Sequence, residues 1–113
     1  NATVGNCFTG DLRGFFESIR RLMALPDNTR IFAGHDYVRD SLAFARLLEP
    51  DNPEIERFRQ ICDPYFLHST LAQEKKMNPY LRFNEAPIVR LLQERNLPRA
   101  TEWERWQSLM TIE

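Results

Sequence analysis

The sequence has few of the features that mark secreted or membrane proteins. Only two of its 113 residues are cysteines, Cys7 and Cys62, whereas 42% of the residues are hydrophobic and eight are phenylalanine. A chain this rich in apolar side chains needs no disulfide framework, so both cysteines are predicted to be free thiols in a reducing compartment. No apolar run approaches the roughly 18 residues of a membrane span, and no signal-peptide pattern opens the chain. We therefore expect a cytoplasmic protein that does not enter a membrane.

An excess of charge of one sign is also missing. Fifteen Lys and Arg residues stand against sixteen Asp and Glu residues, and the formal net charge is -1. Such a chain has no long-range field that would attract nucleic acid or an anionic membrane surface. We therefore expect neither of these partners.

Helical periodicity dominates the chain. Hydrophobic residues recur at the spacing of a helix face in six segments. Two of these segments begin with a capping box, formed by Thr70 with Gln73 and by Thr101 with Glu104, in which each side chain bonds the other residue's backbone N–H. The predicted helices run from Leu12 to Met23, from Val38 to Leu48, from Pro53 to Ile61, from Thr70 to before Asn78, from Pro87 to Leu92, and from Thr101 to Met110.

One short apolar segment, Arg30 to Ala33, has the composition of a buried strand and ends at Gly34. A strand needs a partner because its backbone N–H and C=O groups must be paired when they are buried. The sequence shows no second strand, so the partner is predicted to lie outside the sequence. The chain is therefore interpreted as a fragment whose fold is mainly α with one short strand.

The loop after this strand holds the most informative residues, Gly34-His35-Asp36-Tyr37. Loops at the carboxyl ends of strands are where α/β proteins gather their functional side chains, and this position suits a metal-binding histidine. A single histidine is more often a hydrogen-bonded structural residue. Both interpretations of His35 stay open at this level.

Several sequence blocks occur in a recognisable order: Leu25 to Tyr37, Phe44-Ala45-Arg46, Glu49-Pro50-Asp51-Asn52, Ser69-Thr70-Leu71-Ala72, Glu74 and Asn78-Pro79-Tyr80-Leu81-Arg82. A series of ordered blocks is far more specific than any one short motif. Together they resemble glyoxalase II, the hydroxyacylglutathione hydrolase family of the metallo-β-lactamase superfamily. The resemblance covers roughly residues 5 to 84.

The resemblance implies the C-terminal fragment of an αββα metallo-β-lactamase fold. Residues 1–37 would be the end of the metallo-β-lactamase domain, with its last strand and ligand loop, and residues 38–113 a helical hydroxyacylglutathione hydrolase-like C-terminal domain. The family uses two divalent metal ions, zinc, iron or manganese, to activate water against a thioester carbonyl. By position, His35 matches the last metal-ligand histidine and Tyr37 matches a tyrosine that contacts glutathione.

The sequence also departs from the family pattern. The His-x-His-x-Asp-His motif is absent, and the only other histidine, His68, is predicted to be a surface or capping residue. Asp11 lies only 24 residues before His35, too close for the family's bridging aspartate, and is interpreted as a helix-start residue. Arg105 is the one basic candidate for the carboxylate of glutathione. Another thioester or another thiol carrier is therefore an open alternative for the substrate.

Two side chains that could form an aromatic cage, Trp103 and Trp106, are predicted to be core or helix-packing residues instead.

These features predict part of a metal-dependent thioester hydrolase that is inactive as an isolated fragment. A single imidazole cannot hold a catalytic zinc, which takes three protein ligands and a water molecule, so we expect no metal on the fragment itself. Its partners would be a thioester substrate and the N-terminal metallo-β-lactamase half of the same protein. The alternatives are a stand-alone helical binding or scaffold module, and a member of the same fold that resembles persulfide dioxygenases and uses a single iron.

Overall fold

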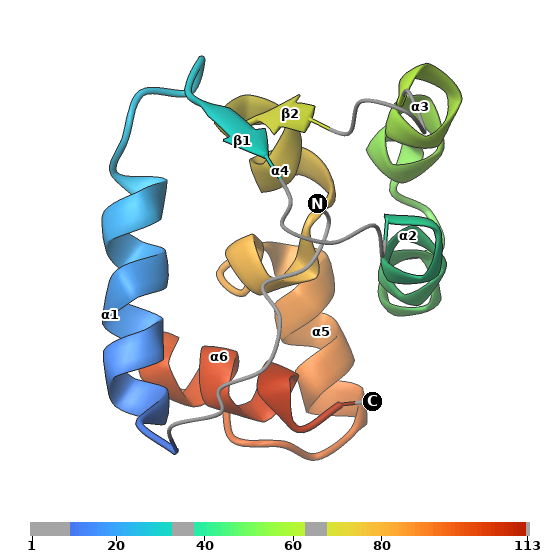
Figure 1. Cartoon of the computed structure of the whole chain (residues 1–113). Coiled ribbons are helices and arrows are strands. Elements are labelled where there is room, and N and C mark those ends of the chain that lie inside the picture. The colour runs from blue at the N-terminus through green and yellow to red at the C-terminus, as the bar shows by residue number, and fades with distance from the viewer. Residues whose placement is uncertain (1–9, 33–37, 63–67, 113) are drawn as a thin grey trace.

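A computed structural model of the chain describes residues 10–32, 38–62 and 68–112 (Figure 1). Helices make up most of this part. The elements in order are α1 (Leu12–Met23), β1 (Arg30–Phe32), α2 (Val38–Leu48), α3 (Pro53–Ile61), β2 (His68–Thr70), α4 (Leu71–Met77), the 3-10 helix η1 (Pro79–Leu81), α5 (Ala86–Glu94) and α6 (Glu102–Met110). The fold class predicted from the sequence, mainly α, is confirmed.

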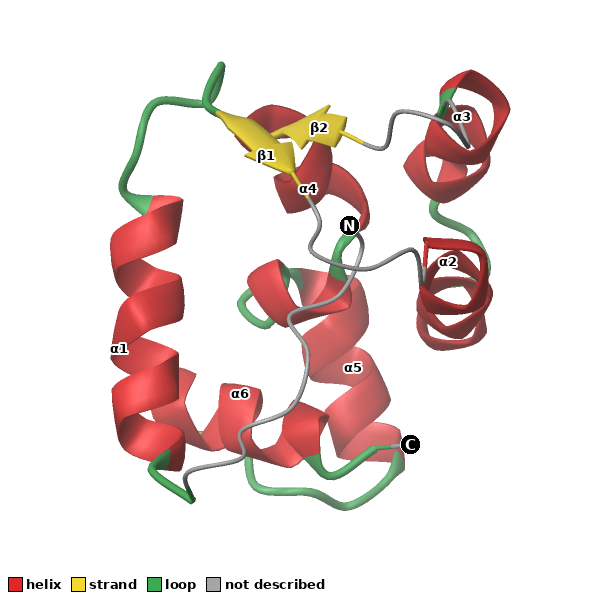
Figure 2. Ribbon diagram, in the orientation of Figure 1, coloured by secondary structure: helices red, strands yellow, loops and turns green. Residues whose placement is uncertain are grey.

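The helices lie in two groups on either side of α4. Helix α1 packs against α6, and α6 packs against α5 and η1, whereas α2 packs on α3 and α3 packs on α4. Figure 2 shows the two short strands lying above α4, between α1 on one side and the α2–α3 pair on the other. Helix α4 and the strands therefore connect the two groups.

The helix starts follow the chemistry that the sequence predicts. Asn52 accepts a hydrogen bond from Glu54 N and precedes Pro53, which opens α3. Both predicted capping boxes are formed, at Thr70 before α4 and at Thr101 before α6. Caps of this kind stabilise a helix by about 1 kcal/mol each because they satisfy backbone N–H groups that the helix leaves unpaired.

The strand prediction was wrong in two respects. Strand β1 has its partner within the chain: β2 pairs with it in an antiparallel register that places Arg30 opposite Thr70 and Phe32 opposite His68. Strand β1 is not fully buried either, since Phe32 is 57% exposed. The three residues of β2 overlap the capping box of α4, and so short an extended segment carries no alternating pattern of its own.

Two hydrophobic cores correspond to the two groups of helices. The larger core is centred on Trp106 and Leu92, which are fully buried, and it takes side chains from α1, α5, α6 and η1. The smaller core lies between α2, α3 and α4 and contains Ala45, Phe58 and Met77. The predicted core positions of the tryptophans are confirmed: Trp106 is completely buried, and the ring of Trp103 packs against Phe16 with centroids 5.4 Å apart.

Among the helices that the structure describes, not one combines the length and the apolar character needed to cross a bilayer.

Candidate functional site

The segment with the predicted site residues joins the end of β1 to the start of α2. His35 and Tyr37 themselves lie outside the described residues, so the structure describes only the residues on either side of this segment. On one side the segment follows Phe32, whose ring stacks on His68 with centroids 6.0 Å apart. On the other side it precedes Val38, which is buried in the smaller core. Both ends of the segment are thus attached to ordered, packed elements.

The residues that lead into β1 are bonded to the start of α4. Beyond the paired strand residues, Leu71 N donates to Thr29 O at 2.8 Å and Ala72 N donates to Asp27 O at 2.9 Å. The first backbone N–H groups of a helix have no partner within that helix. In this protein the unpaired N–H groups of α4 bond the carbonyls that lead into β1, so the hydrogen-bond ladder of the sheet continues into the helix.

A buried polar network lies beneath β2. Ser69, in the middle of the strand, is completely buried, and its hydroxyl donates to Glu74 Oε1 at 3.0 Å. The other carboxylate oxygen of Glu74 accepts from Asn78 Nδ2 at 3.4 Å. Glu74 and Asn78 are each only 2% exposed. A buried carboxylate must be hydrogen-bonded to offset its desolvation, so these three residues have to keep their relative positions.

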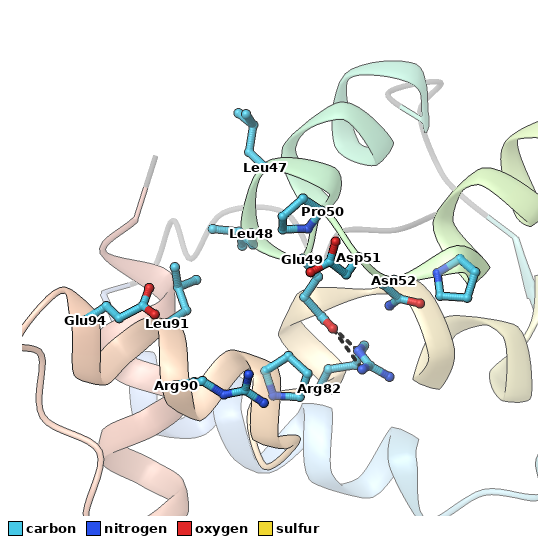
Figure 3. Close-up of a pocket in the computed structure, with 12 residues that line it drawn as sticks. Leu47, Leu48, Glu49, Pro50, Asp51, Asn52, Arg82, Arg90, Leu91 and Glu94 are labelled. Atoms are coloured by element: carbon cyan, nitrogen blue, oxygen red, sulfur yellow. Dashed lines mark hydrogen bonds and ion pairs between the residues drawn. The ribbon is translucent and has the colours of Figure 1, made fainter.

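An ion pair between Glu49 and Arg82 joins the end of α2 to the turn after η1. The guanidinium donates through Nε to Oε1 at 2.7 Å and through Nη2 to Oε2 at 2.9 Å, and it also donates to Lys75 O at 3.2 Å. Figure 3 shows this bidentate pair at one side of a cavity of about 500 Å³. Two parallel hydrogen bonds fix the orientation of both groups, which gives this pair more geometric specificity than a single contact.

A second, larger hollow of about 1070 Å³ lies along α2 and α3. Its apolar lining includes Leu42 and Ile55, and arginines stand around it. Glu56 in this hollow accepts a hydrogen bond from Arg59 Nε at 2.8 Å. This hydrogen bond, together with the nearby positive charges of Arg59 and Arg46, lowers the pKa of the Glu56 carboxyl to about 2.

The described residues do not form a complete metal site. They contain no group of three or more His, Cys, Asp or Glu side chains that could hold an ion. An imidazole at position 35 is a suitable donor for zinc, iron or manganese, but it is one ligand of the several that such a site requires. The described residues therefore bring no set of donors together, and an imidazole at position 35, which lies outside them, would need ligands from elsewhere.

Three residues that the sequence analysis considers as possible site residues lie in the described part of the structure. Asp11 is the N-cap of α1 and accepts a hydrogen bond from Gly14 N, as predicted for a helix-start residue. His68 is exposed, as predicted for a surface residue, and it lies in β2. Arg105 donates from Nε and Nη2 to Asn84 Oδ1 and from Nη1 to Arg99 O. The guanidinium of Arg105 is thus engaged in bonds within the helical domain.

The buried polar residues were not identified as a group from the sequence. Ser69, Glu74 and Asn78, like Glu49 and Arg82, were recognised as parts of matched blocks without an assigned role. One local signal exists, because Glu74 and Asn78 are four residues apart and lie on the same face at the end of α4. The spacing of 33 residues between Glu49 and Arg82 follows from no local rule.

The described residues form a mainly helical fold, and strand β1 of its short sheet leads into the segment that carries His35. Comparison with known proteins gives the family: residues 36–111 match the model of the hydroxyacylglutathione hydrolase C-terminus. The chain belongs to this family, which confirms the resemblance found in the sequence.

Curated relatives support this assignment. A hydroxyacylglutathione hydrolase of Chromohalobacter salexigens is 41% identical over 97 residues, which are 80% of this chain and 38% of that protein. A hydroxyacylglutathione hydrolase of Nitrosomonas europaea is 39% identical over 92 residues, or 75% of this chain and 35% of the relative. One of Photobacterium profundum is 39% identical over 90 residues, or 74% of this chain and 36% of the relative. The chain thus matches little more than a third of the length of these relatives.

Proposed function

We propose that this chain is the C-terminal part of a metal-dependent hydrolase that cleaves thioesters, a glutathione thioester being the first candidate. The observation that carries the proposal is the match of residues 36–111 to the C-terminus of hydroxyacylglutathione hydrolases. The named activity of the relatives supports the substrate class. In this proposal residues 1–37 end the metallo-β-lactamase domain and residues 38–113 form the helical domain.

Within this function, His35 has the role of a metal ligand and Tyr37 that of a substrate-binding residue. The protein would use two divalent metal ions, which polarise the thioester carbonyl and make water nucleophilic near neutral pH. His35 supplies one imidazole, and the other ligands come from the N-terminal half. A protein with this chain alone lacks the ligand number of a catalytic zinc site and is expected to be inactive.

The role of His35 is tested with the protein expressed from its complete gene. We expect His35→Ala to lose at least part of the bound metal, measured by elemental analysis after gel filtration. His68→Phe is the matched control, because it removes the other imidazole of the chain and keeps a ring at position 68 to stack on Phe32. Equal metal content in His35→Ala and the parent protein would exclude His35 as a ligand.

The thiol carrier is tested with two series of acyl thioesters, one on glutathione and one on coenzyme A. An anionic tripeptide is bound by paired cations, and the guanidinium of Arg105 already bonds Asn84 and the carbonyl of Arg99. We nevertheless expect hydrolysis of the glutathione series, because the matched relatives are hydroxyacylglutathione hydrolases, and Tyr37→Phe should raise KM more than it lowers kcat. Faster hydrolysis of the coenzyme A series would reassign the carrier.

Two alternatives have their own signatures in these experiments. A single iron per chain and oxidation of a glutathione persulfide would assign the protein to the persulfide dioxygenase type. Absence of metal and of hydrolysis in the protein from the complete gene would leave a helical binding or scaffold module, in which His35 is a structural residue.

A further inference from the structure

The path from α4 to the site segment is short and made of direct bonds. Glu74 in α4 accepts the hydroxyl of Ser69, which is the central residue of β2 and lies opposite Ile31 of β1. One residue further, Phe32 ends β1, and the segment with His35 follows. The chain from Glu74 to the end of β1 therefore consists of one side-chain hydrogen bond and one strand pair.

Helix α4 is also bonded to the residues that lead into β1. Lys75 Nζ lies 2.8 Å from Asp27 Oδ1, in addition to the two backbone bonds from Leu71 and Ala72. The Thr70 capping box fixes the first turn of α4 at the point where β2 ends. The strand β1 is thus held both at its entry and along its paired edge by residues 69–75.

We propose that Glu74 is a positioning residue for the metal-ligand loop, acting through Ser69 and β2 on the end of β1. Its two carboxylate oxygens accept hydrogen bonds from Ser69 and Asn78, and in this proposal these bonds fix the distance between β2 and α4. A displacement of β2 moves its antiparallel partner β1, because the pairing tolerates little relative shift. The inference rests on the proposed function for its metal readout, but the geometry of β1 can be measured without it.

A purely apolar contact at this place would not have the same effect. Hydrogen bonds to a buried carboxylate are directional, and each remaining oxygen left without a donor costs about 1–3 kcal/mol or more. The network therefore resists small shifts of β2 that a cluster of aliphatic side chains would tolerate by repacking. Glu74 is 2% exposed, so water cannot replace Ser69 or Asn78 as its donors without opening the structure.

The test uses Glu74→Gln in the protein expressed from its complete gene. The variant keeps the size of the side chain and one oxygen for Ser69, but it places an amide N–H₂ against the Asn78 amide donor. We expect the dissociation constant for zinc, measured by competition with a chromogenic chelator, to rise by about fivefold to tenfold. Loss of a group bonded directly to a metal ligand costs at least about tenfold, and Glu74 acts less directly, through β2 and β1. Amide hydrogen exchange of residues 30–32 should become faster in the same variant.

The control for a general loss of stability is Leu92→Ala. Leu92 is fully buried in α5 in the larger core, away from β1, and its truncation should lower the melting temperature at least as much as Glu74→Gln. We expect its zinc dissociation constant and the exchange of residues 30–32 at 20 °C to match those of the parent protein. Equal changes in both variants would overturn the proposal, because they would reflect stability alone.

Rescue gives a second, independent criterion. Adding Asn78→Asp to Glu74→Gln exchanges donor and acceptor between the two positions and leaves one carboxylate in the network. The double variant should recover most of the zinc affinity and the slow exchange of residues 30–32. If Glu74→Gln stays within twofold of the parent in zinc affinity and leaves exchange unchanged, Glu74 has no positioning role.

The two proposals fail in different ways. A parent protein without bound metal would refute the proposed hydrolase function, while faster exchange in Glu74→Gln alone would still establish that Glu74 positions β1. A parent protein with metal, and no response to Glu74→Gln in either measurement, would leave the function intact and refute the positioning role.

Discussion

The two sides of this protein are held together by different forces. The α1, α5 and α6 side is stabilised by aromatic and aliphatic packing around Trp106, whose ring lies 5.4 Å from Phe16 and 5.6 Å from Phe15 between centroids. The side that carries β1, β2 and α4 depends on buried polar groups, above all Glu74 and the Glu49–Arg82 pair. Apolar packing stabilises the fold but constrains the orientation of the packed groups only weakly. Buried hydrogen bonds fix the relative orientation of the bonded groups, at a cost in desolvation. The side with the buried hydrogen bonds contains β1, the strand that leads into the segment of the proposed site.

The largest effect is expected in the apolar region. Trp106→Ala should lower the free energy of unfolding by about 3–5 kcal/mol, because it empties the centre of the larger core. Trp106→Phe should cost much less, because the buried indole N–H has no hydrogen-bond partner among the described residues. Urea denaturation followed by circular dichroism measures both values. A cost below about 1 kcal/mol for Trp106→Ala would show that this side does not depend on aromatic packing.

The buried ion pair tests the polar region in the same assay. Arg82→Ala should cost about 3 kcal/mol, since Glu49, with a side chain only 2% exposed, would keep a buried charge without its partner. The double variant Glu49→Leu with Arg82→Met should be less destabilised than Arg82→Ala, because it removes both charges together. If the double variant is the worse of the two, the pair contributes net stability and the contrast between the regions becomes smaller.

A smaller effect of unusual sign is expected at Gly14. Replacing a glycine within a helix by alanine normally stabilises it by about 1 kcal/mol. A Cβ at position 14 would clash with Asp11 Oδ2, so the side chain that caps α1 would be displaced. We therefore expect Gly14→Ala to destabilise by about 1 kcal/mol. In an Asp11→Ala background the same change should stabilise the protein, which thermal melts would show.

The smallest effect belongs to Glu56 at the surface. Its pKa is lowered from 4.5 to about 2, mainly by the hydrogen bond from Arg59, so the folded state favours the carboxylate. The resulting stabilisation is present above pH 4.5 and is lost as the pH falls toward 2. Melting temperatures of Glu56→Gln and the parent should differ slightly at pH 6 and converge near pH 2. A difference that grows on acidification would contradict the assigned cause.

The site shows where reasoning from sequence reaches its limit. Position 35 could be chosen because the histidine follows a strand and lies within ordered blocks of a recognisable family. The bonds that support this position could not, because Ser69 resembles any polar residue before a helix and Glu74 resembles any charged residue on a helix surface. Their burial depends on what packs against α4. Met77, at the end of α4, lies in the smaller core with side chains of α2 and α3. Burial of this kind is a property of the assembled chain.

The sequence by itself determined the helices, their caps, the tryptophan core and the family. These features follow from spacings of three and four residues, and from the order of motifs, which are local properties of the chain. Only the tertiary structure decided that β1 pairs with β2, where Arg30 lies opposite Thr70, 40 positions later in the chain, and that Glu49 meets Arg82. Pairing over such separations is set by packing and loop closure rather than by local preference, so no short segment contains it.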